Sequence, residues 1–149
     1  MLKGRTLKNN KGQTLVEFAL VLFLLLAILF GIVEFGRLWF YSNHLNNSVR
    51  AAARYGAVLG SGFSTSAIDT YLRKEIGSFM PADDIDKNTG VVVTVYDGAT
   101  ANTKSASAIV RGDTVKVTVT YNFRVLSGSI IPFFKGDYTI VRTASMRFE

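Results

Sequence analysis

The sequence has 149 residues, of which 48% are hydrophobic and 19% charged, and this length suits one ordinary domain. It contains no cysteine and one histidine, which excludes disulfides, thiolate zinc sites and histidine-rich metal sites. The apolar content and the presence of only 2 prolines exclude a disordered or proline-rich chain.

The net charge of +6 comes mostly from the N-terminus. Residues 1–12 hold no acid and four basic residues, Lys3, Arg5, Lys8 and Lys11. The rest of the chain is close to neutral, so a nucleic-acid partner is not expected. The four cations instead form a basic leader.

An unbroken apolar run, FALVLFLLLAILFGIV, follows at residues 18–33, between Glu17 and Glu34. With its neighbours it can cross about 30 Å of hydrocarbon at about 1.5 Å per residue, and we expect a transmembrane segment over about residues 14–36. A buried core helix is the alternative, but such a helix has a polar face. A cleaved secretory signal is a second alternative, but no small-x-small site follows the run.

The basic leader places the N-terminus in the cytoplasm and the larger, C-terminal part outside it. Trp39, Phe40 and Tyr41 fit an aromatic belt at the far membrane interface. The chain is therefore expected to cross the membrane once, with its N-terminus in the cytoplasm.

Beyond the apolar run, large and small apolar residues recur at intervals of three and four, which predicts an amphipathic helix. They are Leu38, Tyr41, Leu45, Val49, Ala52, Gly56 and Leu59. We expect one helix over residues 13–59, ended by Gly60-Ser61-Gly62. His44, among asparagines on this helix, is expected to be solvated.

Residues 60–149 predict a small α+β head outside the membrane, with an antiparallel sheet packed on the amphipathic part of the helix. Residues 64–80 indicate a short helix with Ser64 or Ser66 as its N-cap. Period-two alternation predicts strands around residues 91–96, 114–123 and 138–148, with a long loop at 98–112. The sheet is expected to have three or four strands.

Motifs for catalysis are lacking, since the sequence has no GxSxG, GxGxxG or GxxxxGK[ST] pattern. We expect no enzyme activity and no cofactor. Asp84, Asp86 and Asn88 resemble the start of a calcium loop, but Thr89 replaces the turn glycine and Val95 the closing glutamate. A solvated acidic turn is the preferred interpretation of this weak calcium candidate.

The stretch KGQTLVEF at residues 11–18, between a basic leader and an apolar run, resembles the processing site of type IV pilin-like precursors. The segments FGIVEFGR at 30–37 and AAARYGA at 51–57 resemble TadE-like pseudopilins of tight-adherence pilus systems, and the ending ASMR at 144–147 is similar to that family's C-terminal end. Ordinary type IV pilins have Phe or Met after the cleaved glycine, whereas this chain has Gln13.

The resemblance implies cleavage by a prepilin peptidase after Gly12, which would remove the leader and make Gln13 the mature N-terminus. It also implies a minor pilin or pseudopilin that primes or caps a pilus, with other pilin-like subunits, the assembly machinery and membrane lipid as partners. Glu17 would meet the amine of Gln13 on a neighbouring subunit, and Phe18 is a second residue expected to serve subunit assembly. The alternative is a membrane-anchored envelope protein whose head binds a partner without forming a filament. An anchored hydrolase is a third hypothesis, disfavoured by the missing catalytic groups.

Overall fold

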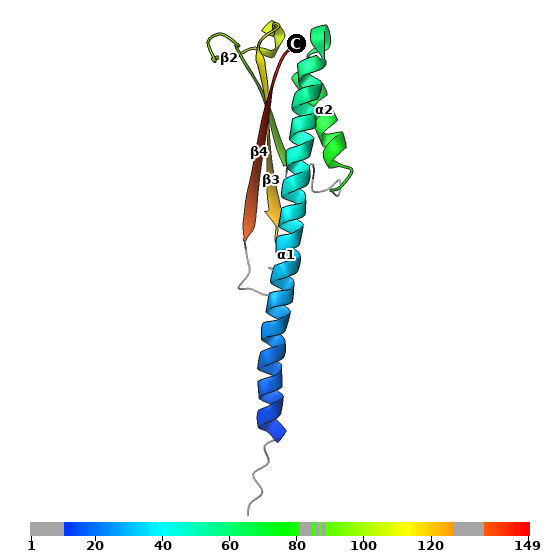
Figure 1. The fold of residues 1–149 in the computed structure, drawn as a ribbon. Helices are drawn as coiled ribbons and strands as arrows, with labels where there is room; N and C mark the ends of the chain where they lie inside the picture. Colours follow the sequence, from blue (N-terminus) through cyan, green and yellow to red (C-terminus); the bar gives the residue numbers. More distant parts are fainter. Residues whose placement is uncertain (1–10, 81–84, 86, 88, 127–135) are drawn as a thin grey trace, which may run out of the picture. The chain divides into compact units, whose positions relative to one another are not determined.

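The computed structural model describes residues 11–80, 85, 87, 89–126 and 136–149. Figure 1 shows helix α1 (Lys11–Val58), helix α2 (Thr65–Ile76) and the strands of a single sheet. The strands are β1 (Thr89–Tyr96), β2 (Thr103–Lys104), β3 (Thr114–Arg124) and β4 (Asp137–Arg147), and two short 3-10 turns lie at Gly60–Gly62 and Ala106–Ala108. The chain divides into two compact units, Met1–Gly36 and Arg37–Glu149.

The unit Arg37–Glu149, here called the head, contains an antiparallel sheet with strand order β2-β1-β3-β4. Strand β3 lies in the middle and pairs along its length with both β1 and β4. At the centre of this register, Val117 of β3 faces Val93 of β1 and Ala144 of β4. The three long strands thus present matching rows of side chains on each face of the sheet.

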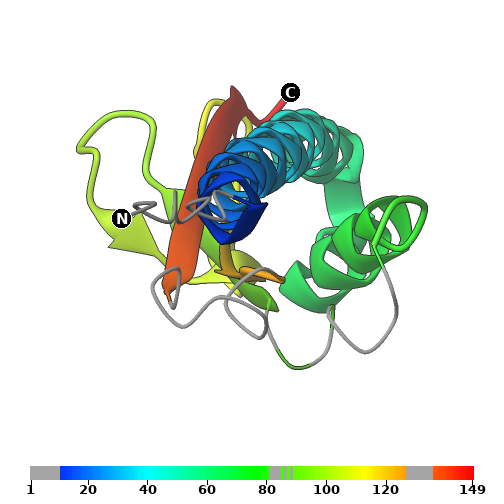
Figure 2. The same cartoon turned by 90° about the horizontal axis from the view of Figure 1, so that it is seen from below.

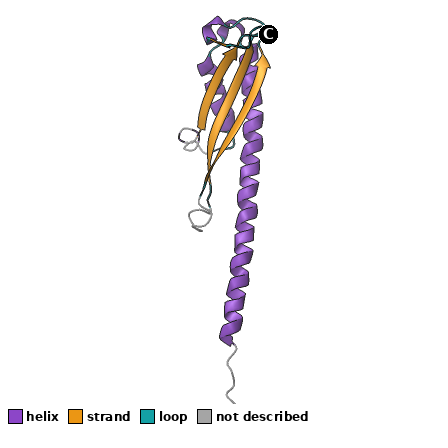
Figure 3. Cartoon of the chain, turned by 90° about the vertical axis from the view of Figure 1, so that its left-hand side faces the viewer, coloured by secondary structure: helices purple, strands orange, loops and turns teal. Residues whose placement is uncertain are grey.

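Alternation along β3 separates a buried face from a polar one. Its buried residues are Val115, Val117, Val119, Tyr121 and Phe123, and the residues between them are threonine, lysine and asparagine. β-Branched and aromatic side chains favour this extended, half-buried setting. Figure 3 shows the long strands beside the helices, and the polar residues of β3 alternate with those that enter the core.

Both helices of the head cover the other face of the sheet (Figure 2). From α1, Leu45, Val49 and Ala52 are fully buried in the core. Helix α2 contributes Ile68, Leu72 and Ile76, which are also fully buried. Each large aliphatic side chain stabilises the head by about 1.5–3 kcal/mol through its removal from water. The C-terminal part of α1 is therefore an integral part of the head.

The unit Met1–Gly36 is described from Lys11 as helix throughout. Most of its side chains from Gly12 onward are exposed, including nearly all of the apolar ones. This helix is long and apolar enough to cross a membrane. None of its most apolar 18-residue stretch is buried. In water such a surface would be strongly unfavourable, so it needs lipid or another apolar partner.

The fold class predicted from the sequence is confirmed: a long N-terminal helix, a short second helix and an antiparallel sheet form an α+β chain. Ser64 takes the predicted N-cap position of α2 with an extended backbone. The sheet has four strands, because the predicted loop at 98–112 contains the short strand β2. His44 is not simply solvated, since its ring packs 4.2 Å from the ring centre of Phe40 and 4.7 Å from that of Phe79.

Candidate anchoring and assembly segment

The start of α1 carries the residues that the sequence singled out for processing and assembly. Gly12 and Gln13 lie in helical conformation, and both are exposed. A Cβ atom added at Gly12 would have no neighbouring atom within 4 Å. Glycine lowers helix stability by about 1 kcal/mol relative to alanine. The Gly12–Gln13 bond is thus open to solvent and lies at a weak point of the helix.

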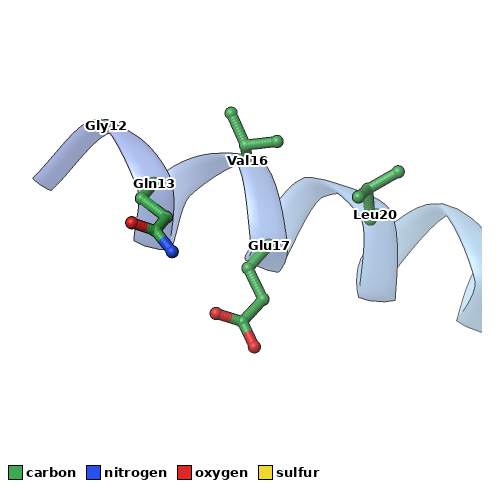
Figure 4. A pocket seen from close by; sticks show the side chains of 5 residues that line it. All are labelled: Gly12, Gln13, Val16, Glu17 and Leu20. Atoms are coloured by element: carbon green, nitrogen blue, oxygen red, sulfur yellow. The ribbon is translucent and has the colours of Figure 1, made fainter. Parts of the chain in front are cut away.

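Gln13 and Glu17 lie on the same side of this helix, four residues apart, as Figure 4 shows. Val16 and Leu20, labelled in the same view, line the same shallow surface as the polar pair. The four residues are spaced by three and four, so the polar pair and the two apolar side chains share one broad face of the helix. A single ligand or neighbouring helix that approaches this side would meet both the amide and the carboxylate.

Phe18 is the first residue of the unbroken apolar run, and its side chain is 64% exposed. Exposure continues through Val33, and the residues concerned are mainly leucine, phenylalanine, valine and isoleucine. A helix that is apolar around its whole circumference is typical of a membrane span or of the centre of a helical bundle. Glu17 is the acid that precedes this surface, and Glu34 the acid that follows it.

Some of the predicted leader and metal-binding residues cannot be placed on the fold. The leader residues Lys3, Arg5 and Lys8 and the calcium candidates Asp84, Asp86 and Asn88 lie outside the described residues. Lys11 is described as helical. Within the described ranges, no group of three or more His, Cys, Asp or Glu side chains could hold a metal ion.

A buried carboxylate, Asp113, joins the loops at the end of the sheet where β3 begins. Its Oδ2 atom accepts hydrogen bonds from the backbone N–H of Val110 at 2.9 Å and from the Lys104 ammonium at 3.0 Å. Its Oδ1 atom accepts the backbone N–H of Gly98 at 3.2 Å. The N–H of Val110 and then the Lys104 side chain hold the pKa of Asp113 below its ordinary value. This arrangement fixes loop geometry and leaves the carboxylate no open side for a ligand.

Arg142 has a contact that the sequence alone did not reveal. It lies on the apolar face of β4, opposite Val119, and its Nη2 atom donates a hydrogen bond to the Ser42 hydroxyl on α1. Its Nη1 atom donates to the carbonyl of Val141 at 2.9 Å. An arginine within a period-two apolar run was a visible signal, but its partner lies 100 residues away in the chain.

Comparison with protein families gives a match to the TadE-like protein family over residues 12–54. The matched segment is less than a third of the chain, and the chain is similar to TadE-like proteins there. The match confirms the resemblance seen in the sequence and associates the chain with the tight-adherence pilus. No curated protein and no solved structure matches the chain.

The TadE-like segment begins at Gly12 and contains the exposed apolar surface. It also includes Leu45, Val49 and Ala52, which α1 contributes to the core of the head. Helix α2 and the whole sheet lie beyond it. The family resemblance is therefore carried by α1, which fits a single-pass membrane anchor.

Proposed function

We propose that this chain is a minor pilin or pseudopilin of a tight-adherence pilus and that it primes or caps the filament through α1. The TadE-like match over residues 12–54 is the observation that carries the proposal. It coincides with a helix whose apolar side chains are exposed and need a partner. The role is structural, with no catalytic step and no cofactor.

The proposed location is the bacterial inner membrane. The cations Lys3, Arg5, Lys8 and Lys11 favour a cytoplasmic N-terminus, so the head lies outside the cytoplasm. A prepilin peptidase would remove residues 1–12 and leave Gln13 as the new N-terminus. The exposure of both residues at the Gly12–Gln13 bond supports such processing.

Assembly would bring α1 helices of neighbouring subunits together. Because lipid tails are as apolar as leucine, helix association in a membrane depends on packing and polar contacts rather than on the hydrophobic effect. Glu17 supplies such a polar contact, and the amine of Gln13 on a neighbouring subunit is its proposed partner. Each charge would then neutralise the other where neither could remain alone. Phe18, exposed beside Glu17, supplies packing area.

The proposal is tested by deleting the gene and counting pili by electron microscopy. A priming subunit predicts that few or no filaments form, whereas a capping subunit predicts filaments of altered length. Complementation with the full chain should restore the normal number and length. A matched control is complementation with residues 37–149 carried on a cleavable secretory signal, which provides the head without the apolar part of α1.

Normal filaments in the deletion strain would contradict a role in the pilus and would favour the membrane-anchored envelope protein. Restoration by the secreted head alone would contradict assembly through α1. The deletion strain thus tests whether the chain acts in the pilus, and the secreted head tests whether it acts through α1.

A further inference from the structure

Exposed aromatic side chains of the head are concentrated near the point where the chain enters it. Among the described residues from Arg37 onward, Trp39 is 64% exposed, Phe40 46% and Tyr138 58%. Leu126, which follows β3, is 60% exposed. The other large exposed hydrophobic residues among the described residues of the head are not aromatic, and they are Val58, Val92, Val110, Val141 and Met146.

Contacts within the head place these side chains at one end of the sheet. The Arg37 guanidinium carbon lies 5.0 Å from the ring centre of Phe123, and the Tyr41 ring centre lies 5.8 Å from the same ring. Phe123 is paired with Tyr138 across β3 and β4. The first turn of α1 in the head is thus level with the last residues of β3 and the first of β4. Leu126 follows β3 at this end.

Basic groups accompany the aromatic ones. Arg37 lies beside Phe123, and the exposed Arg124 is the last residue of β3. At this end of the β3–β4 hairpin, the described residues include one acid, Asp137. It pairs with Arg124 in the strand register. Tyrosine and tryptophan rings with nearby arginines are typical of the interface between membrane and water.

Chain length keeps this end of the head near the membrane. Val33 is the last residue of the apolar run, and Arg37 follows four residues later. Four residues span at most about 14 Å even when fully extended. In contrast, Thr114 at the other end of β3 is ten residues from Arg124, a separation of about 34 Å in a strand. Whatever the orientation of the apolar segment, the end that carries Arg37 is tethered beside the bilayer.

We propose that Trp39, Phe40, Leu126 and Tyr138, with Arg37 and Arg124, form a second lipid contact, here called the interfacial rim. Its partner is the headgroup–acyl boundary of the bilayer that holds the anchor, so the proposal rests on the membrane anchoring proposed above. A neighbouring protein could use similar side chains. Lipid is favoured because the tether brings the bilayer to this end in every copy of the chain.

The rim gives the head a preferred orientation. Leu126 and Tyr138 come from the β3–β4 hairpin, and Trp39 and Phe40 come from α1. Contact of both elements with the same lipid surface would fix the head at two places instead of leaving it to pivot about the chain at Gly36–Arg37. The sheet end near Asp113 would then face away from the membrane.

Depth-dependent tryptophan quenching tests this contact in the full chain, because Trp39 is the only tryptophan. The chain is reconstituted in phosphatidylcholine–phosphatidylglycerol vesicles that contain lipids brominated near the headgroup. In a Trp39→Phe background, Tyr138→Trp places the reporter on the rim and Val110→Trp places it at the other end of the sheet. Both positions are exposed, so either reporter fits without repacking the core. We expect loss of fluorescence and a blue-shifted emission for Tyr138→Trp, and neither change for Val110→Trp.

Equal quenching of the two reporters, or none at position 138, would overturn the rim. Co-sedimentation of the chain with vesicles after an alkaline wash is measured on the same samples. A chain that stays in the bilayer with an unquenched reporter at position 138 overturns the rim and leaves the anchor intact. Loss of the chain from the vesicles overturns the anchor and the rim together.

Discussion

Gly56 of α1 lies so close to Ile68 of α2 that a Cβ atom at position 56 would be 2.7 Å from the Cδ1 atom of Ile68. The same atom would lie 3.3 Å from the Cγ1 atom of Val115 on β3. Ile68 and Val115 are both fully buried, so neither can move away freely. Three elements of the head therefore meet at a position where only hydrogen fits without rearrangement.

We expect Gly56→Leu to destabilise the head by about 2–3 kcal/mol or more. Overpacking a filled core costs about 1–3 kcal/mol, and a leucine side chain is large enough to reach the upper end of that range. Arg54→Leu is the matched control, since Arg54 is exposed two residues earlier on the same helix. Its effect should stay within about 0.5 kcal/mol. Thermal unfolding followed by circular dichroism measures both. Equal stability of the two variants would show that the contact at Gly56 can relax.

The part of α1 from Arg37 onward should be required for the head to fold. A fragment of residues 37–149 retains Leu45, Val49 and Ala52, and we expect it to be monomeric, with mixed helix and strand content. A fragment of residues 60–149 lacks that buried stripe and would expose the apolar face of the sheet, so we expect it to aggregate. Gel filtration and circular dichroism distinguish the two. A folded, monomeric 60–149 fragment would contradict the packing described here.

The fragment begins at Arg37 because the second compact unit of the chain begins there. Periodicity identified the buried stripe of α1 because large apolar residues recur at helical spacing. It could not show that the charged Arg37 lies over the Phe123 ring, since that contact joins residues far apart in the chain. The contact of Arg142 with Ser42 was beyond prediction for the same reason.

Strands were predictable where alternation was long. Strand β3 alternates over its whole length, and the predicted and observed strands agree closely. Strand β2 has only two residues, too few for a period to be recognised. Its position depends instead on tertiary contacts, in which the Lys104 ammonium bonds Asp113 and lies 3.7 Å from Asp97. The processing and assembly residues Gly12 and Glu17 came from the family resemblance, and their roles remain predictions.

Acid should loosen the loops around Asp113. The pKa of this carboxyl is lowered in the folded protein, chiefly by the Val110 N–H, against an unfolded value of about 3.9. Its stabilising contribution is therefore complete above that unfolded value and is lost as the pH falls through the folded pKa. We expect the melting temperature of the 37–149 fragment to fall as the pH is lowered from about 4 toward 2.

Asp113→Asn is the matched variant for this pH dependence. It keeps the shape of the side chain but removes the charge that faces Lys104. Its melting temperature should be lower at pH 6, and the further fall between about pH 4 and 2 should be shallower. Asp97, whose pKa is also lowered by the backbone N–H groups of Thr100 and Ala99, should account for part of the remaining slope. Parallel curves for the native and variant proteins would contradict the assignment to Asp113.

Processing is expected between Gly12 and Gln13. Intact mass analysis of the chain extracted from membranes with an active prepilin peptidase should show the loss of residues 1–12. Gly12→Leu should block cleavage by adding a side chain next to the bond, while membrane insertion continues because the apolar run is unchanged. Gly31→Leu is a control, since Gly31 also has no atom within 4 Å of an added Cβ and lies far from the bond. Full-length mass for the native chain in the presence of the peptidase would contradict this prediction.

Glu17 is expected to serve subunit assembly and not insertion. Glu17→Gln removes the charge while keeping nearly the same shape, so insertion and cleavage after Gly12 should proceed at least as well as in the native chain. Incorporation into the pilus complex should fall, because the Gln13 amine of a neighbouring subunit would be left unpaired in an apolar bundle at a cost of about 3–5 kcal/mol.

Glu34→Gln is the matched control for the effect of Glu17→Gln on subunit assembly. Glu34 is the other acid that borders the apolar run, but it is partly buried, lies near Arg37 in the sequence and is far from Gln13. Near the water interface the removal of one charge costs about 0–1 kcal/mol, so assembly should change little. Each variant is measured by co-purification with the pilus machinery at equal membrane abundance. If Glu17→Gln assembled normally and Glu34→Gln did not, the acid that pairs with a neighbouring subunit would lie at the other end of the apolar segment.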